Sequence, residues 1–393
     1  MAKQDNKTHP TLTPAQAKDF IEEMTLKLQE QGQQPIPTML WGQPGVGKSS
    51  IIVQLGKKYK RNVIDVRLLL KDPTDIAGLP YFDANEGKLK VSTPSDFPDI
   101  TNPEHSHLLN SIIIFDELSS APKAVQSAAL QLILDRRIGN YELPKDVIMV
   151  AAGNRAEDGN VFEQMPTPLR NRFAHIDIEA NFEQWKEWAM YEGDIHPVVV
   201  SFLESNGGEF NTFDPKESHR YAFATPRSWE RVSDALWGCT DRATLQVKGS
   251  ANSIMWKVGS LIGLDVASKF NAYLQTFGQM PSPVDVLSGK VKEFDFNTMG
   301  KNAQSGRYGM VLGLTHIMRE RYDDIRGDAA KETAFDKKES TNFAKFIKNS
   351  MSDAEEFMAI AGENVLRVAK IPVHKNPEFK ELVTAISGIL NQI

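Results

Sequence analysis

The sequence predicts an α/β fold, with a parallel sheet in the first half of the chain and helices in the second. Residues 112–115 and 147–152 are apolar runs without alternation, which is typical of strands buried on both faces of a parallel sheet. A glycine-rich loop at 42–50 connects a short apolar run, 38–41, to a predicted helix. From Asn181 onward the apolar residues recur at helical spacing. A sheet domain followed by helical regions is therefore expected.

The composition is that of a soluble globular protein and argues against several other classes. The 393 residues suffice for two or three domains, and the net charge of −6 disfavours a protein that coats nucleic acid, although it is compatible with a local basic patch. The one cysteine, Cys239, can form neither an intrachain disulfide nor a multi-cysteine metal site. The first ten residues lack the apolar core of a signal peptide, and no apolar run approaches the ~18 residues of a membrane span. A cytoplasmic location without membrane contact is expected.

The loop GQPGVGKSS has the composition and the flanks of a phosphate-binding P-loop. Its glycines allow the backbone N–H groups to approach a phosphate closely, and the helix that follows adds the positive end of its dipole. Lys48 is expected to reach the β- and γ-phosphates, and the Ser49 hydroxyl to bind Mg²⁺. The alternative is a glycine-rich turn that carries a lysine by chance, which the flanking strand and helix disfavour. The candidate nucleotide-binding residues are Gly42, Gln43, Pro44, Gly45, Val46, Gly47, Lys48, Ser49 and Ser50.

Polar side chains follow two of the predicted strands, at the edge of the sheet where ligands bind. Asp116 and Glu117 end the run 112–115, and behind a P-loop such a pair supplies a Mg²⁺ ligand, Asp116, and a general base, Glu117. Their alternative is a pair of N-cap residues for the next helix. Asn154 follows the run 147–152 and is expected to contact the γ-phosphate or the attacking water, unless it is only a turn residue.

Three arginines are candidates for phosphate contact. Arg170 and Arg172 are unlikely residues for burial without partners, so they suit contact across a subunit boundary, or else they are plain surface charge. Arg227 lies in the first turn of a helix predicted from Thr225 and Pro226, where a cation is unfavourable for the helix dipole. An anionic partner for Arg227 is therefore expected.

The remaining pattern defines the predicted domains. Residues 1–12 are expected to be a flexible N-terminus, and Thr13 is expected to cap a helix. The proline-rich segment 71–107 predicts an irregular insertion with a short helix near 73–77 and a hairpin edge at 88–91. Further predicted elements are strands at 62–66 and 174–178, a helix at 121–135, a hairpin at 136–143 with Gly139-Asn140 at its turn, and C-terminal helices at 307–319, 341–350, 353–360 and 380–390. The expected domains are an α/β core (13–180), a helical lid (181–280) and a helical C-terminal extension (281–393).

Over residues 15–275 the set of motifs resembles AAA+ ATPases, and in detail the MoxR-like branch with an insertion in its second helix. The stretch DELSSAPKAVQSAALQLILDRRIG is similar to that branch from the Walker B strand to the hairpin before sensor 1, and ATPRSWE is similar to its sensor 2 region. The residues after 281 and the segment AAGNRAEDGN at the predicted sensor 1 position depart from the family pattern. The resemblance implies Walker A roles for Lys48 and Ser49, Walker B roles for Asp116 and Glu117, sensor roles for Asn154 and Arg227, and Arg172 as the arginine finger with Arg170 as second candidate.

The resemblance also implies a function. It suggests Mg²⁺-dependent hydrolysis of ATP to ADP and phosphate by a ring, expected to be a hexamer, that remodels a protein partner, often one with a von Willebrand factor A-type domain. ATP and Mg²⁺ are the expected cofactors. The alternatives are a nucleic-acid-associated motor and a nucleotide-gated assembly switch in a defence or mobile-element system.

Overall fold

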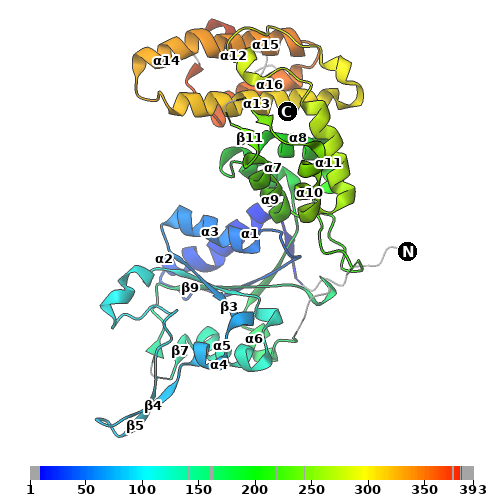
Figure 1. The fold of residues 1–393 in the computed structure, drawn as a ribbon. Coiled ribbons are helices and arrows are strands. Elements are labelled where there is room, and N and C mark those ends of the chain that lie inside the picture. The colour runs from blue at the N-terminus through cyan, green and yellow to red at the C-terminus, as the bar shows by residue number, and fades with distance from the viewer. Residues whose placement is uncertain are drawn as a thin grey trace. The chain divides into compact units, whose positions relative to one another are not determined.

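The computed structural model describes residues 9–139, 141–158, 163–217, 219–242, 244–373, 376–380 and Leu382. The chain divides into two compact units (Figure 1). The first unit comprises Met1–Gln184 with Phe213–His219, and the second comprises Trp185–Thr212 with Arg220–Ile393. No helix in the described part of the chain combines the length and the apolar character that crossing a membrane requires.

A six-stranded sheet forms the centre of the first unit. Its strands, in spatial order, are β1 (Thr11–Leu12), β10 (Ala174–Ile178), β2 (Thr38–Trp41), β9 (Ile148–Gly153), β6 (Ile112–Asp116) and β3 (Val63–Arg67). Every neighbouring pair in this sheet is parallel. Strands β2 and β9 are buried throughout, as the apolar runs without alternation indicated. The predicted α/β fold with a parallel sheet is confirmed.

Helices cover both faces of this sheet, because side chains alternate between the faces along each strand. Leu40 belongs to the core that includes residues of α1 (Pro14–Ile21) and α3 (Lys48–Tyr59). Its neighbours Met39 and Trp41 belong to the other core. That core includes residues of α4 (Pro73–Ala77), α5 (Lys123–Asp135) and α6 (Thr167–Arg170). The predicted capping role of Thr13 is confirmed, since its side chain and that of Gln16 form a capping box at the start of α1.

The N-terminal prediction is wrong for two residues. Thr11 and Leu12 form the edge strand β1, paired with Asp177 and Ile178 of β10, so they are not part of a flexible segment. Ladder hydrogen bonds from Asp177 N to Pro10 O (2.9 Å) and from Glu179 N to Leu12 O (3.2 Å) hold this strand. Two residues are too few to show a period in the sequence, and the pairing partner lies far along the chain. The element was therefore not foreseeable from local pattern.

The insertion at 71–107 has the predicted character. It contains α4, an antiparallel hairpin of β4 (Pro80–Asp83) and β5 (Lys88–Val91), and a 3₁₀ helix, Pro103–Leu108. Figure 1 shows the β4–β5 hairpin extending away from the central sheet of its unit. A second hairpin, β7 (Arg137–Ile138) with β8 (Tyr141–Glu142), follows α5 as predicted. Its expected turn residue Asn140 lies outside the described residues.

The second unit is helical. Its elements, with α7 reaching back across the division, are α7 (Phe182–Tyr191), α8 (Pro197–Ser205), α9 (Pro226–Trp237), α10 (Ala251–Ile262), α11 (Leu264–Phe277), α12 (Pro283–Leu287), α13 (Ala303–Asp323), α14 (Ala329–Phe335), α15 (Thr341–Met351), α16 (Glu355–Arg367) and the hairpin β11 (Thr240–Asp241) with β12 (Gln246–Val247). Helix α8, from the predicted lid, packs along α13, from the predicted extension. Both helical regions therefore contribute to one compact unit. Most of the helix predicted at 380–390 lies outside the described residues.

Candidate nucleotide-binding site

The loop between β2 and α3 depends on two of its glycines. Gly47 caps α3 with φ of 97°, a left-handed conformation in which a side chain is strained. A Cβ at Gly42 would lie 2.8 Å from the carbonyl oxygen of Ile178 in β10, so the loop runs directly against the neighbouring strand. The backbone between β2 and α3 thus follows a tight path, packed against β10, as a phosphate-binding loop requires.

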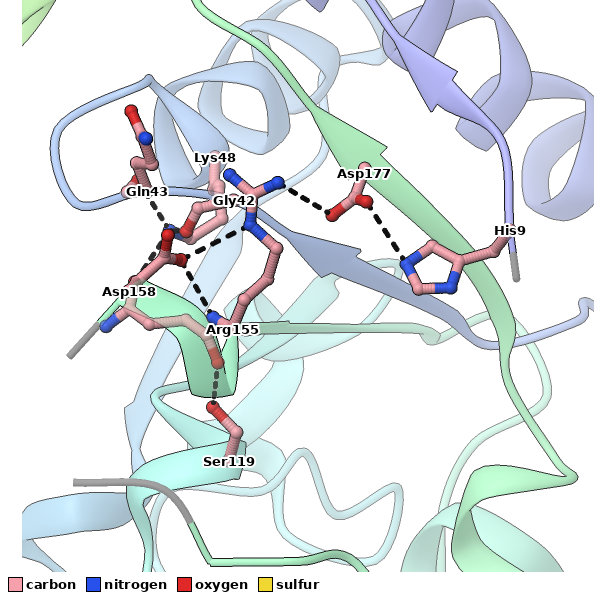
Figure 2. A network of polar contacts seen from close by, with 9 residues as sticks. His9, Gly42, Gln43, Lys48, Ser119, Arg155, Asp158 and Asp177 are labelled. Carbon is pink, nitrogen blue, oxygen red and sulfur yellow. Dashed lines mark hydrogen bonds and ion pairs between the residues drawn. The ribbon is translucent and has the colours of Figure 1, made fainter. Parts of the chain in front are cut away.

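Lys48 is buried at the first position of α3, and its ammonium group lies across the loop. Its Nζ donates hydrogen bonds to Gly42 O (2.7 Å), Gln43 O (3.1 Å) and the side-chain Oδ1 of Asn154 (3.0 Å) (Figure 2). A lysine ammonium has three protons to donate, so these three contacts fix the orientation of the Lys48 side chain. The structure thereby brings together the predicted phosphate-binding lysine and the predicted sensor asparagine, which are far apart in the sequence.

Ser49 and Asp116 form the second half of the site. The Ser49 hydroxyl donates to Asp116 Oδ2 at 3.0 Å, and Asp116 Oδ1 accepts from Glu117 N at 2.9 Å. A hydroxyl and a carboxylate are oxygen ligands of the kind that Mg²⁺ prefers in nucleotide sites. The residues present therefore fit a Mg²⁺ ion held by Ser49 and Asp116 together with the phosphates of a nucleotide.

Glu117 has an unusual backbone conformation. It lies directly after β6 with φ of 59°, in the left-handed region, before the 3₁₀ helix Leu118–Ser120. For a residue other than glycine such a conformation costs on the order of 1–3 kcal/mol and tends to occur at functional sites. Glu117 is the predicted general base, and its residue type alone gives no sign of this strain.

Asn154 follows the last residue of β9 and is held on its main chain as well. Ser119 Oγ donates to Asn154 O at 2.9 Å. A Cβ at Gly153 would lie 2.5 Å from Ser119 Oγ and 2.7 Å from Met39 Cε, so β9 and the segment after Glu117 are in close contact here. The carboxyl ends of β2, β6 and β9 thus converge on one site, as expected of a parallel sheet.

Arg170 and Arg172 lie at the end of α6 and just beyond it. Both are exposed, and Arg170 Nη2 donates to Thr167 Oγ1 at 3.1 Å. Arg227 belongs to the second unit, where it is exposed in the first turn of α9; the N-cap Thr225 and Pro226 are as predicted. The roles of these three arginines stay predictions.

His175 connects the strand before the loop to the backbone of Arg170. Trp41 Nε1 donates to His175 Nδ1 at 3.0 Å, so His175 carries its proton on Nε2, which donates to Arg170 O at 2.7 Å. Burial lowers the pKa of His175, which keeps the ring neutral at pH 7. A single neutral imidazole therefore links β2 to the segment that carries the predicted arginine finger.

Sequence reasoning missed an ionic network beside Asn154. Arg155 lies between the carboxylates of Asp158 and Asp177, and Asp177 also pairs with His9 at 3.4 Å (Figure 2). One feature of the sequence indicates this network. Asp177 lies between Ile176 and Ile178 in a predicted strand, and a charged residue at such a position needs a partner.

Comparison with known proteins gives the family of this region. Residues 38–180 match the family model described as ATPase family associated with various cellular activities (AAA). These residues form an AAA domain. The matched range begins with β2 and ends just after β10, so it contains the loop, Asp116, Glu117 and Asn154. With this AAA domain the chain is an ATP-hydrolysing enzyme of the AAA+ type.

The chain is also similar to several solved structures. The Holliday junction branch migration motor RuvB of Thermotoga maritima is 15% identical over 74% of this chain and 81% of its own, with a TM-score of 0.36. A putative ATPase from Cytophaga hutchinsonii is 15% identical over 66% and 80%, with a TM-score of 0.29. NtrX from Brucella abortus is 12% identical over 82% and 66%, with a TM-score of 0.33. At these scores the likenesses carry no inference about substrate.

Replacing Lys48 by alanine is expected to weaken ATP binding by about 10- to 100-fold, since hydrogen bonds to charged groups contribute roughly 1.5–3 kcal/mol each. The side chain that crosses the loop would be lost, while the loop glycines would remain. Titration with a fluorescent ATP analogue measures the effect. Lys57→Ala, at an exposed position of the same helix, is the control. Unchanged affinity in Lys48→Ala would contradict the assignment of the loop.

Proposed function

We propose that the chain is a ring-forming, Mg²⁺-dependent ATPase of the MoxR-like branch that remodels a protein partner. The proposal is supported by the order of the motifs, by the fit of Ser49 and Asp116 to Mg²⁺, and by the insertion at 71–107. The resemblance suggests a hexamer and a partner with a von Willebrand factor A-type domain, and a cytoplasmic location is part of the proposal.

The observation that best supports a protein partner is the surface of the β4–β5 hairpin. Tyr81, Phe82 and Leu89 are large apolar side chains that stay exposed, Phe82 to 66% and Leu89 to 76%. Phe82 pairs with Leu89 across the hairpin, so these two exposed side chains lie on one face, whereas Tyr81 lies on the other. Exposed apolar side chains that lie together on a soluble protein indicate a contact surface for another protein. The hairpin is thus the expected place where the ATPase meets its partner.

The charges of the hairpin favour a protein over a nucleic acid. Lys90 forms ion pairs with Asp83 (2.7 Å) and with Glu86, so its charge is compensated within the hairpin. Nucleic-acid binding surfaces instead carry an excess of lysine and arginine. A nucleic-acid motor and a nucleotide-gated switch are the alternatives. Stimulation of the ATPase by DNA, compared with stimulation by a protein, separates the nucleic-acid motor from the protein-remodelling motor.

A ring is supported by the exposure of Arg170 and Arg172. An arginine that completes the site of a neighbouring copy must be accessible, and repeated head-to-tail contacts close into a ring when the rotation permits. In this arrangement each subunit supplies the loop, the Mg²⁺ ligands and the general base to its own nucleotide, and an arginine to the next.

Replacing Lys88-Leu89-Lys90 by Gly-Ser-Gly is expected to preserve basal ATP hydrolysis and to abolish its stimulation by the partner. The change removes one exposed apolar side chain and the ion pairs of Lys90, and it leaves the loop at 42–50 intact. ATPase rates with and without the partner give the answer. Leu264→Ser, which changes another exposed apolar side chain, is the control. Normal partner binding and remodelling in the replaced protein would refute a role for the hairpin.

A further inference from the structure

Arg155, the residue after Asn154, is held at two carboxylates. Its backbone N donates to Asp158 Oδ2 at 2.9 Å, and its Nε donates to the same oxygen at 3.3 Å. Its Nη1 lies 3.7 Å from Asp177 Oδ1. Figure 2 shows the guanidinium between these two side chains. Arg155 therefore joins the end of β9 to β10.

The network is almost completely removed from water. The side chains of Asp158 and Asp177 are 2% and 3% exposed, and that of Arg155 is 15% exposed. Burying charges costs several kcal/mol per ion, and paired buried charges often contribute little to net stability compared with apolar residues. Such a network is better explained by the geometry that it imposes than by the stability that it adds.

The geometry imposed is that of Asn154. The Asn154 side chain contacts Lys48 Nζ, its carbonyl oxygen accepts from Ser119, and the next residue is fixed by Asp158 and Asp177. Ser119 itself lies two residues after Glu117. Without the Arg155 side chain, the turn after β9 would keep its main-chain bonds to Asp158 but would lose its connection to Asp177 in β10. Asn154 could then rotate away from Lys48.

We propose that Arg155 is a positioning residue for ATP hydrolysis, which holds Asn154 in the orientation that the reaction needs. Arg155 acts through Asn154 and does not itself contact the nucleotide. The inference rests on the proposed sensor role of Asn154. A misplacement of a reacting group by about 1 Å can cost on the order of 10²-fold in rate, which is the scale of effect expected here.

The test compares Arg155→Met, Arg155→Lys, Asn154→Ala and the double variant Asn154→Ala/Arg155→Met in steady-state ATPase assays. We expect Arg155→Met to lower kcat by about 10- to 100-fold with KM within about threefold. Arg155→Lys, which keeps the charge, should recover part of the rate. Because both residues act through one group, the double variant should be as slow as Asn154→Ala alone, within about twofold.

Arg136→Met is the matched control for the loss of a partly buried arginine. Arg136 donates to Pro144 O and Val147 O, just before β9 begins, at the end of the strand opposite to Asn154. It should leave kcat unchanged even if it lowers the melting temperature. A wild-type kcat in folded Arg155→Met, or losses that multiply in the double variant, would overturn the proposal.

Circular dichroism and gel filtration establish whether each variant folds. If Arg155→Met does not fold, Asp177→Asn takes its place, since it keeps the shape of the side chain and removes one charge of the network. Asp177→Asn should then lower kcat, and by no further amount in the Asn154→Ala background. An unchanged kcat would overturn the proposal. If Asn154→Ala were as fast as the wild type, the sensor assignment would be refuted rather than the hold exerted by Arg155.

Discussion

Glu117→Gln is expected to bind ATP as tightly as the wild type and to hydrolyse it about 10²- to 10⁴-fold more slowly, the usual contribution of a general base. Glutamine has the same size and can keep the backbone conformation at this position. It leaves the contact between Ser49 and Asp116 unchanged, so nucleotide and Mg²⁺ should still bind. Only the group that accepts a proton from the attacking water is removed.

Titration with a fluorescent ATP analogue measures the affinity for nucleotide. A single-turnover assay measures the rate of hydrolysis separately. Glu157→Gln, which neutralises an exposed carboxylate in the segment after Asn154, is the control and should hydrolyse ATP normally. Turnover by Glu117→Gln at the wild-type rate would refute the assignment of the base.

Arg172→Ala is expected to bind ATP and to lose about 10³- to 10⁵-fold in turnover, the contribution of an arginine supplied to a neighbouring phosphoryl-transfer site. Arg172 is exposed beyond α6, and the effect should require assembly. Arg170→Ala, at the second candidate, is the comparison and should lose less. High activity of Arg172→Ala as a dilute monomer would rule out a shared site.

Mixing two inactive variants gives a sharper test of the shared site. An Arg172→Ala subunit retains Glu117, and a Glu117→Gln subunit retains Arg172. In a mixed ring, a Glu117→Gln subunit can supply Arg172 to the site of a neighbouring Arg172→Ala subunit. In an equal random mixture about a quarter of the contacts have this arrangement, so about a quarter of the sites should be active. Activity that stays at the level of the separate variants would show that Arg172 does not act across a contact.

The fold and the centre of the site were predictable from local patterns. The loop glycines, Lys48 and the runs before Asp116 and Asn154 each lie in one continuous stretch, and the order of strand, loop and helix gives their placement in a parallel sheet. Thr13 and Thr225 were identified as helix caps for the same reason, since a cap acts on a residue three positions away.

What could not be predicted depends on register between distant segments. Arg155 meets Asp177, and Asp177 meets His9, only because β10 lies between β1 and β2. The left-handed conformation of Glu117 follows from the packing at the end of β6, which the residue type does not reveal. These features arise from tertiary structure. The position of Asp177 between two isoleucines indicates that it needs a partner, but a local pattern does not say which residue that partner is.

The spatial order of the strands has a consequence for synthesis on the ribosome. β2 is synthesised early, but the two strands that pair with it, β9 and β10, are synthesised much later. β1 also pairs with β10, so it too stays unpaired until β10 has been synthesised. A nascent chain that has emerged only to the loop therefore exposes unpaired strand edges, which are prone to aggregation. ATP cannot stabilise the nascent chain at that stage. Asn154, which contacts Lys48, and Ile178, against which Gly42 packs, have not yet been synthesised. The nucleotide can stabilise this domain only once β10 has been translated.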